Sequence, residues 1–246
     1  MTDDPSAEAW QRVGALLPGP TYLQHLSGLH MLLRPTTYLE IGVHTGLSLH
    51  LAQPPTQAFG VDPDSRIGDP QFAAPTQLFA MTSDAFFAVE HAGNALRGAA
   101  IDLAFIDGLH LFEQALRDFI NVERHAAPHG VIALHDTLPV TAASAAREPI
   151  DGLWCGDVWR ILPCLGKWRP DLHVASIPAP PSGLTVATRL DPASRVLEAH
   201  YDAIVAEFLA YPYAWLEAHL AELTAARDNS PTTLVRALGL TDGAAR

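Results

Sequence analysis

The chain has 246 residues, 48% of them hydrophobic and 17% charged, which supplies a buried sheet and excludes an intrinsically disordered chain. Lys and Arg number 15 against 27 Asp and Glu, so the net charge is −12 and a nucleic-acid backbone would be repelled. This balance favours a small-molecule substrate, neutral or cationic, over nucleic acid or an anionic membrane.

Two helices are expected over residues 5–33, interrupted at 18–20 by the sequence Pro-Gly-Pro. After them, short apolar runs alternate with helical stretches. The runs that predict strands are 36–42, 57–62, 76–81, 101–107 and 130–136, and the helical stretches lie around 46–52, 84–97 and 109–126. Repeated strand–helix–strand units predict a doubly wound, Rossmann-like α/β fold with a parallel sheet.

The alternation of strands and helices changes after the fifth predicted strand. Residues 158–168 are expected to form a helix that Pro163 kinks. Two further strands, 172–178 and 183–190, are joined by a connection short enough for an antiparallel hairpin, which makes a seven-stranded mixed sheet. Helices are then expected over 193–225, interrupted at Pro212, and over 231–240. We expect three parts, which are an N-terminal helical cap (1–34), a core (35–192) and a C-terminal helical extension (193–246).

The first strand ends in the pattern E-x-G-x-x-x-G, formed by Glu40, Gly42 and Gly46. Glycines at a strand-to-helix turn allow close approach of a ligand to the backbone. A nicotinamide fingerprint would read G-x-G-x-x-G, and a carboxylate at the strand end would oppose a pyrophosphate. The same carboxylate favours a cofactor with a positive sulfonium and an ammonium group. His44 and Ser48 of this turn are expected to border the cofactor, although such turns also occur purely as packing devices.

Acidic residues follow the next two strands. Asp62 closes the second strand, 22 residues after Glu40, where an acid can accept hydrogen bonds from both hydroxyls of a ribose. Ser83 and Asp84 follow the third strand, where Asp84 could accept from an adenine amino group. Ser83 could also cap the helix that follows it.

These segments resemble the class I S-adenosylmethionine-dependent methyltransferases. The resemblance covers about residues 36–190, and its motifs are YLEIGVHTG, GVD and FIDGLHLFEQALRDFINVERHAAPHGVIALHD. It is strongest to a bacterial branch, related to macrolide and sugar O-methyltransferases, whose fourth and fifth strands end in IDG-x-H and HD. The resemblance implies S-adenosyl-L-methionine as the cofactor, with its methionine part at Glu40, Gly42 and Gly46. It places the ribose at Asp62 and the adenine at Ser83 and Asp84.

Strands four and five end in two carboxylates and two imidazoles, which are Asp107, His110, His135 and Asp136. Both strand ends open onto the same edge of a parallel sheet, so we expect the four side chains to converge, with Asp107 also bordering the cofactor. Asp107, His135 and Asp136 could hold a divalent cation, Mg²⁺ or a transition metal, and His110 or His135 could act as a base. A purely structural role is the remaining alternative.

The resemblance favours the metal, because related methyltransferases bind magnesium with acids at these strand ends. His135 departs from that pattern. A bound cation would lower the pKa of an acceptor hydroxyl. The acceptor could be a sugar hydroxyl, a phenol or an amine, and an O-methyl product in secondary or sugar metabolism is favoured because the polar cluster suits deprotonation of a hydroxyl. Trp154, Trp159 and Trp168 are candidates for the acceptor pocket, as is the Gly156-Asp157 pair.

The sequence argues against three other functions. A nicotinamide-dependent oxidoreductase would need a third glycine that the turn after the first strand lacks. A metal-dependent oxygenase is usually built on a β-barrel, whereas this chain alternates strands and helices. A non-catalytic protein with a degenerate fold conflicts with the intact set of Glu40, Gly42, Gly46 and Asp62.

The remaining expectations concern assembly and compartment. The apolar residues of 193–225 exceed what one sheet face needs, which predicts a homodimer or a higher homo-oligomer. These residues are Leu197, Ile204, Val205, Phe208, Leu209 and Trp215. An acidic start without an apolar stretch, and apolar runs too short to span a bilayer, predict a cytoplasmic protein. Cys155 and Cys164 are expected to be free thiols.

Overall fold

The computed structural model describes residues 5–68, 71–88, 92–225 and 228–240. Its centre is a seven-stranded sheet in the order β3-β2-β1-β4-β5-β7-β6. The strands are β1 (Thr37–Ile41), β2 (Gln57–Val61), β3 (Thr76–Phe79), β4 (Ile101–Ile106), β5 (Ala126–His135), β6 (His173–Ile177) and β7 (Leu184–Thr188). All seven strands were predicted from the sequence, and the doubly wound α/β fold is confirmed.

The sheet is mixed. Strands β1 to β5 pair in parallel, while β7 runs antiparallel to both β5 and β6. The late hairpin therefore closes a parallel sheet, as expected. Because β1, β2, β4 and β5 point the same way, their carboxyl ends open at one edge, and the site residues follow these ends.

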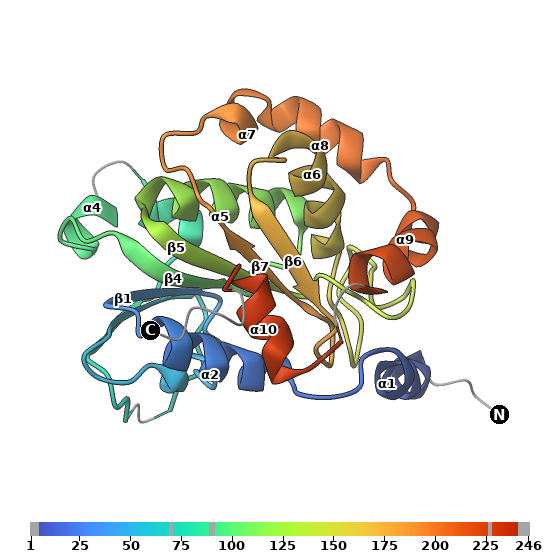
Figure 1. Ribbon diagram of the computed structural model, residues 1–246, viewed down its shortest axis with the longest axis horizontal. Coiled ribbons are helices and arrows are strands. Elements are labelled where there is room, and N and C mark those ends of the chain that lie inside the picture. The colour runs from blue at the N-terminus through green and yellow to red at the C-terminus, as the bar shows by residue number, and fades with distance from the viewer. Residues whose placement is uncertain (1–4, 69–70, 89–91, 226–227, 241–246) are drawn as a thin grey trace.

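Helices cover both faces of the sheet (Figure 1). They are α1 (Pro5–Leu16), α2 (Tyr22–Leu33), α3 (Ser83–Phe86), α4 (Ala92–Ala95), α5 (Phe112–His125), α6 (Ile161–Trp168), α7 (Val196–Ala199), α8 (Tyr201–Leu209), α9 (Tyr213–Ala225) and α10 (Pro231–Ala237). Strand alternation divides the core. Leu39 and Ile41 of β1 face the cluster built with α5, α6 and α8, whereas Tyr38 faces the cluster built with α2 and α10.

Three local predictions were wrong. The helix expected over 46–52 is only a single 3-10 turn, η1 (Leu49–Leu51). Pro54 and Pro55 follow it and lack the N–H groups that a longer helix needs. The stretch 158–168 is not kinked at Pro163, because a 3-10 turn, η2 (Val158–Arg160), comes first and Pro163 lies in the first turn of α6, where no N–H partner is lost. The stretch 84–97 contains two short helices, α3 and α4, and residues 89–91 lie outside the described residues.

The C-terminal apolar residues pack inside the same chain. Leu197, Ile204 and Phe208 are buried in the core beneath α8, and Trp215 stacks on Trp159 at 6.1 Å. These side chains therefore do not need a second subunit to cover them, and the homo-oligomer remains a prediction. The three-part division of the chain also remains a prediction, since α2 and α10 pack on the same sheet as the core helices.

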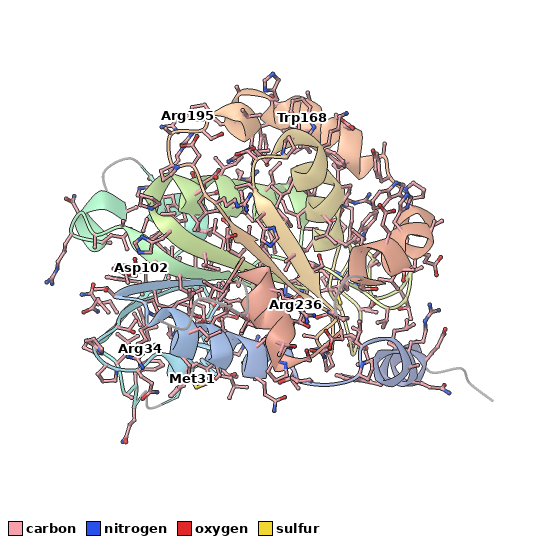
Figure 2. The ribbon with its side chains drawn as sticks, in the orientation of Figure 1. Met31, Arg34, Asp102, Trp168, Arg195 and Arg236 are labelled. Carbon is pink, nitrogen blue, oxygen red and sulfur yellow. The ribbon has the colours of Figure 1, made fainter. Side chains whose placement is uncertain are left out.

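Both cysteines are buried free thiols, as expected. Among the described residues, no helix is both long enough and apolar enough to cross a bilayer. Figure 2 shows the side chains on this framework, with Trp168 near the top of the view and Arg236 on α10.

Candidate active site

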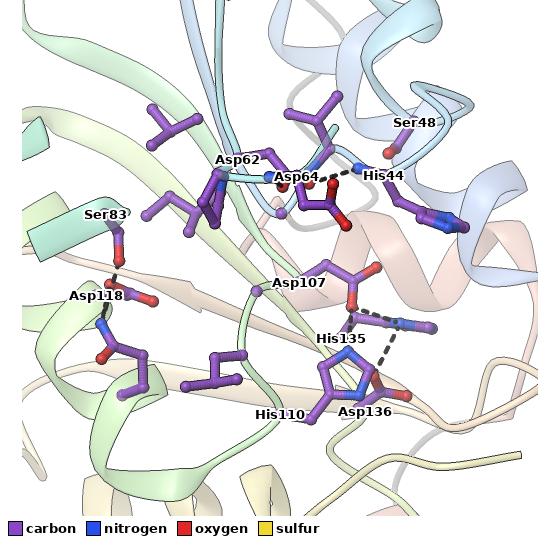
Figure 3. Close-up of a pocket in the computed structure, with 18 of the residues that line it drawn as sticks. His44, Ser48, Asp62, Asp64, Ser83, Asp107, His110, Asp118, His135 and Asp136 are labelled. Atoms are coloured by element: carbon purple, nitrogen blue, oxygen red, sulfur yellow. Dashed lines mark hydrogen bonds and ion pairs between the residues drawn. The ribbon is translucent and has the colours of Figure 1, made fainter. Parts of the chain in front are cut away.

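A cavity of about 960 Å³ opens at the carboxyl ends of the parallel strands. Its walls are the loops after β1, β2, β3, β4 and β5, with additions from α2, α5 and the β6–β7 connection (Figure 3). Small-molecule sites occupy about 300–1,000 Å³, so this cavity is at the large end of the range. Of the predicted cofactor residues, those that line it are Gly42, His44, Ser48, Asp62, Ser83, Asp84 and Asp107.

The turn after β1 depends on a glycine. Gly42 has a φ of +83°, and a Cβ placed on it would lie 1.9 Å from the carbonyl oxygen of Asp107. Gly42 therefore lets the turn after β1 pass directly against the turn after β4. Gly46 has a φ of +81° and lies outside the cavity wall, so it shapes the turn without lining the cavity.

Glu40, predicted to bind the cofactor, lies behind the turn and does not line the cavity. Strand alternation places its side chain on the same face as Tyr38, and it is fully buried. The Tyr38 hydroxyl donates to Glu40 Oε2 at 2.6 Å, and the Ser48 hydroxyl donates to Oε1 at 2.7 Å. Burial raises the pKa of Glu40 to about 8, and these two hydrogen bonds only partly oppose the shift.

Replacing Glu40 by glutamine is expected to flatten the pH dependence of folding stability. The raised pKa means that the folded chain holds a proton that the unfolded chain releases above its ordinary pKa of 4.5. Stability should therefore fall as pH rises from about 4.5 to about 8, by up to about 1.4 kcal/mol per pH unit. Urea unfolding of both proteins at pH 5 to 8 measures the difference. Parallel curves for the two proteins would show that Glu40 does not titrate in this range.

Asp62 joins the end of β2 to the turn after β1. Its Oδ2 accepts hydrogen bonds from the backbone N–H groups of Val43 at 2.8 Å and His44 at 2.7 Å. Its Oδ1 accepts from the N–H of Asp64 at 2.7 Å. The carboxylate is thus held rigidly at the cavity wall, between two of the loops that form it.

The loop after β3 meets α5 at another part of the cavity. The Gln114 side-chain amide lies 3.1 Å from Ser83 Oγ, 3.2 Å from Asp84 Oδ1 and 3.0 Å from Asp118 Oδ1. Burial raises the pKa of Asp118 to about 6. Thr82, and not Ser83, caps α3 by accepting from the N–H of Ala85.

Gln114 and Asp118 were not predicted as site residues. They lie one helical turn apart on α5 and are both buried. A polar i, i+4 pair on the buried face of an amphipathic helix is the signal that could have identified them. No comparable signal marks Tyr22, which reaches the cavity from α2.

The four predicted side chains at the ends of β4 and β5 do converge (Figure 3). His110 Nε2 lies 3.5 Å from Asp107 Oδ1 and 3.2 Å from Asp136 Oδ2. His135 Nδ1 lies 3.2 Å and 3.5 Å from the same two oxygens, and its Nε2 is 3.2 Å from Ser182 Oγ. One ligand atom each from Asp107, His110 and Asp136 lies within 4.8 Å of the others, a spacing that could hold a metal ion.

The charges in this cluster balance each other. Burial alone would lower the pKa values of the two imidazoles, but the carboxylates outweigh it and raise that of His110 to about 9 and that of His135 to about 10. Burial would likewise raise the pKa values of Asp107 and Asp136, but the imidazoles hold both below their ordinary range. Two carboxylates therefore attract two positive charges into the cavity wall.

The loop after β5 supplies one of the predicted aromatic residues. Trp154 lines the cavity and packs on His110 with ring centroids 4.9 Å apart. Trp159 is buried in the core, and Trp168 packs on His200, so neither lines the cavity.

The predicted substrate contact at Gly156 and Asp157 was wrong. Gly156 has a φ of +60°, and a Cβ there would lie 1.7 Å from the carbonyl oxygen of His110. Asp157 is fully buried, accepts from the Phe112 N–H at 2.8 Å and pairs with Arg147 and Arg160. Asp157 therefore caps α5.

The parallel sheet, the glycine turn and the acidic residues at successive strand ends are the features on which the chain can be compared with known proteins. Residues 39–137 match the model of a family described as a methyltransferase domain. This segment begins in β1 and ends just after β5, so it contains the glycine turn and the carboxylate–imidazole cluster. This part of the chain is therefore similar to a methyltransferase domain.

Solved structures share the fold. Cofactor-bound Rv0187 from MTB is 20% identical with a TM-score of 0.54, and the match covers 77% of this chain and 91% of that one. The O-methyltransferase TomG from Streptomyces achromogenes, in complex with SAM, is 18% identical with a TM-score of 0.50, covering 76% and 90%. Among curated proteins, no sequence matches the chain.

Proposed function

We propose that this chain transfers the methyl group of S-adenosylmethionine to a hydroxyl group of a small molecule, with help from a divalent cation. The observation that carries the proposal is the cluster of Asp107, His110 and Asp136, which lies in the same cavity as the glycine turn. A hydroxyl acceptor must lose a proton during transfer, and a carboxylate–imidazole cluster is chemistry suited to that loss.

The cofactor side of the cavity fits S-adenosylmethionine in charge and shape. The turn from Gly42 to Ser48 would border its methionine part, Asp62 its ribose, and Ser83, Asp84, Gln114 and Asp118 its adenine. When bound, the cofactor supplies a methyl group already activated by a positively charged sulfur. The many carboxylates favour a cation here and oppose the pyrophosphate of a dinucleotide.

The residues proposed to bind the cation differ from the sequence prediction in one histidine, since His110 takes the place of His135. His110 has a ring nitrogen close enough to the carboxylates of Asp107 and Asp136 for the three residues to hold one ion. His135 has one nitrogen facing the carboxylates and the other beside Ser182, so it is better placed to orient Asp107 than to bind the ion. A cation held here would lower the pKa of a nearby hydroxyl.

Neither histidine is suited to act as a free base while the cavity holds no cation. The two carboxylates stabilise the protonated imidazoles, which opposes proton uptake from an acceptor at neutral pH. A divalent cation would supply the positive charge in their place. The acidic surroundings also favour a neutral or cationic acceptor, which we place in secondary or sugar metabolism.

S-adenosylhomocysteine is expected to bind the purified chain in the micromolar range, which corresponds to roughly 7–8 kcal/mol. Asp62→Ala should weaken this binding by about 1–3 kcal/mol, because the variant loses charge-assisted hydrogen bonds and also releases the N–H groups of Val43 and His44. Calorimetry measures both values, with NADH as the comparison ligand. Heat with NADH and none with S-adenosylhomocysteine would overturn the proposal.

A further inference from the structure

Tyr22 reaches the cavity from outside the methyltransferase segment. It is the first residue of α2, and its ring packs on His135 with centroids 3.9 Å apart and the planes tilted by 33°. On the same sheet face it stacks near Phe105 at 6.1 Å. His135 is therefore enclosed between the sheet and a tyrosine that the N-terminal helix carries.

Two contacts fix the start of α2. Thr21 and Gln24 form a reciprocal capping box, so the helix begins at Tyr22 with its backbone direction set. The N–H of Tyr22 donates to the carbonyl oxygen of Pro180 at 3.2 Å, in the connection between β6 and β7. The same connection carries Ser182, the partner of His135 Nε2.

Asn229, in the segment before α10, holds the turn that leads into α2. Its side-chain amide donates to the carbonyl oxygens of Pro18 and Pro20, both at 2.9 Å. Its Oδ1 lies 2.6 Å from Nε2 of His25, which is buried on the first turns of α2. A Cβ on Gly19 would lie 2.8 Å from the Asn229 carbonyl oxygen, so the two segments are in close contact.

We propose that Tyr22 is a positioning residue that holds the His135 ring against Asp107, and that Asn229 in turn positions Tyr22. A ring stacked on the imidazole limits its rotation and excludes water from the His135–Asp107 pair, which strengthens that interaction. The catalytic meaning of the inference rests on the proposed function. The contacts of Tyr22 with His135 and of Asn229 with the turn before α2 do not depend on a bound ligand.

Histidine-ring NMR of the ligand-free protein tests the first step, with the His135 signal identified from its loss in His135→Gln. A tyrosine stacked on the imidazole shields its protons, so Tyr22→Leu should move the His135 signal downfield, while Tyr22→Phe keeps the ring and the signal. Thermal unfolding confirms that each variant is folded, and Tyr22→Met replaces Tyr22→Leu if the latter is not. An unchanged His135 signal in the folded leucine or methionine variant would overturn the inference.

Asn229→Ala tests the second step. It should shift the His135 signal in the same direction as Tyr22→Leu, whereas Arg236→Ala, an exposed change on the neighbouring α10, should not. A folded Asn229→Ala protein with the wild-type signal would remove Asn229 from the inference. S-adenosylhomocysteine affinity, measured by calorimetry, should stay within about twofold in the Arg236→Ala control, which lies outside the cavity wall. Failure of the wild-type chain to bind that ligand would count against the proposed function alone, since the His135 shift does not depend on it.

Discussion

Asp136→Ala is expected to lower the rate of methyl transfer by about 10²–10⁴-fold while S-adenosylhomocysteine still binds. Asp136 is buried, and its Oδ2 faces both His110 and His135, so the variant removes the charge that organises the cluster. The residues proposed to contact the cofactor lie mainly on the loops after β1, β2 and β3, which the variant leaves in place. Single-turnover assays over a panel of phenol and sugar acceptors measure the rate, and calorimetry measures the affinity.

The matched control is Asp202→Ala, which removes an exposed carboxylate on α8 outside the cavity wall. It should leave the rate unchanged. Exhaustive EDTA treatment should abolish turnover in the wild-type protein, and Mg²⁺ should restore it. Turnover that survives EDTA but is lost in His110→Ala would move the mechanism to metal-free base catalysis. Full activity in both Asp136→Ala and His110→Ala would assign the cluster a structural role.

Asp157→Ala is expected to destabilise the fold by about 3–5 kcal/mol. Asp157 is fully buried and pairs with Arg147 at 2.6 Å and Arg160 at 2.9 Å, while its other oxygen caps α5 at Phe112. Arg160 also donates to the carbonyl oxygens of Phe208 and Tyr211, so the carboxylate joins α5 to the C-terminal helices. Removing it leaves the guanidinium groups without their shared partner and an uncapped helix N-terminus.

Urea unfolding measures this difference, and Asp202→Ala again serves as the control, with an expected change within about 0.5 kcal/mol. Cofactor affinity measured well below the denaturation range should be less affected than stability. An Asp157→Ala protein of wild-type stability with lost turnover would restore the substrate contact that the sequence suggested.

Much of the site followed from topology that the sequence encodes. Short apolar runs located the strands, and parallel strands bring their carboxyl ends to one edge, so the convergence of Asp107, His110, His135 and Asp136 could be predicted. The glycine turn was predicted at this edge as well, because it follows the carboxyl end of the first strand. Its glycines, however, serve the packing of the turn: Gly42 makes room for the Asp107 carbonyl oxygen.

The sequence by itself determined the succession of strands and helices along the chain and the late hairpin, because these depend on local periodicity. It also contains the short motifs through which residues 39–137 resemble a methyltransferase domain. Tertiary structure alone decided which side chains face the cavity. Glu40 is buried and accepts hydrogen bonds from Tyr38 and Ser48. Asp157 caps α5 instead of lining the cavity, whereas Tyr22 lines it from a distant helix. These outcomes depend on contacts between segments far apart in the chain, such as Asn229 with Pro18 and Pro20, and no local pattern records such contacts.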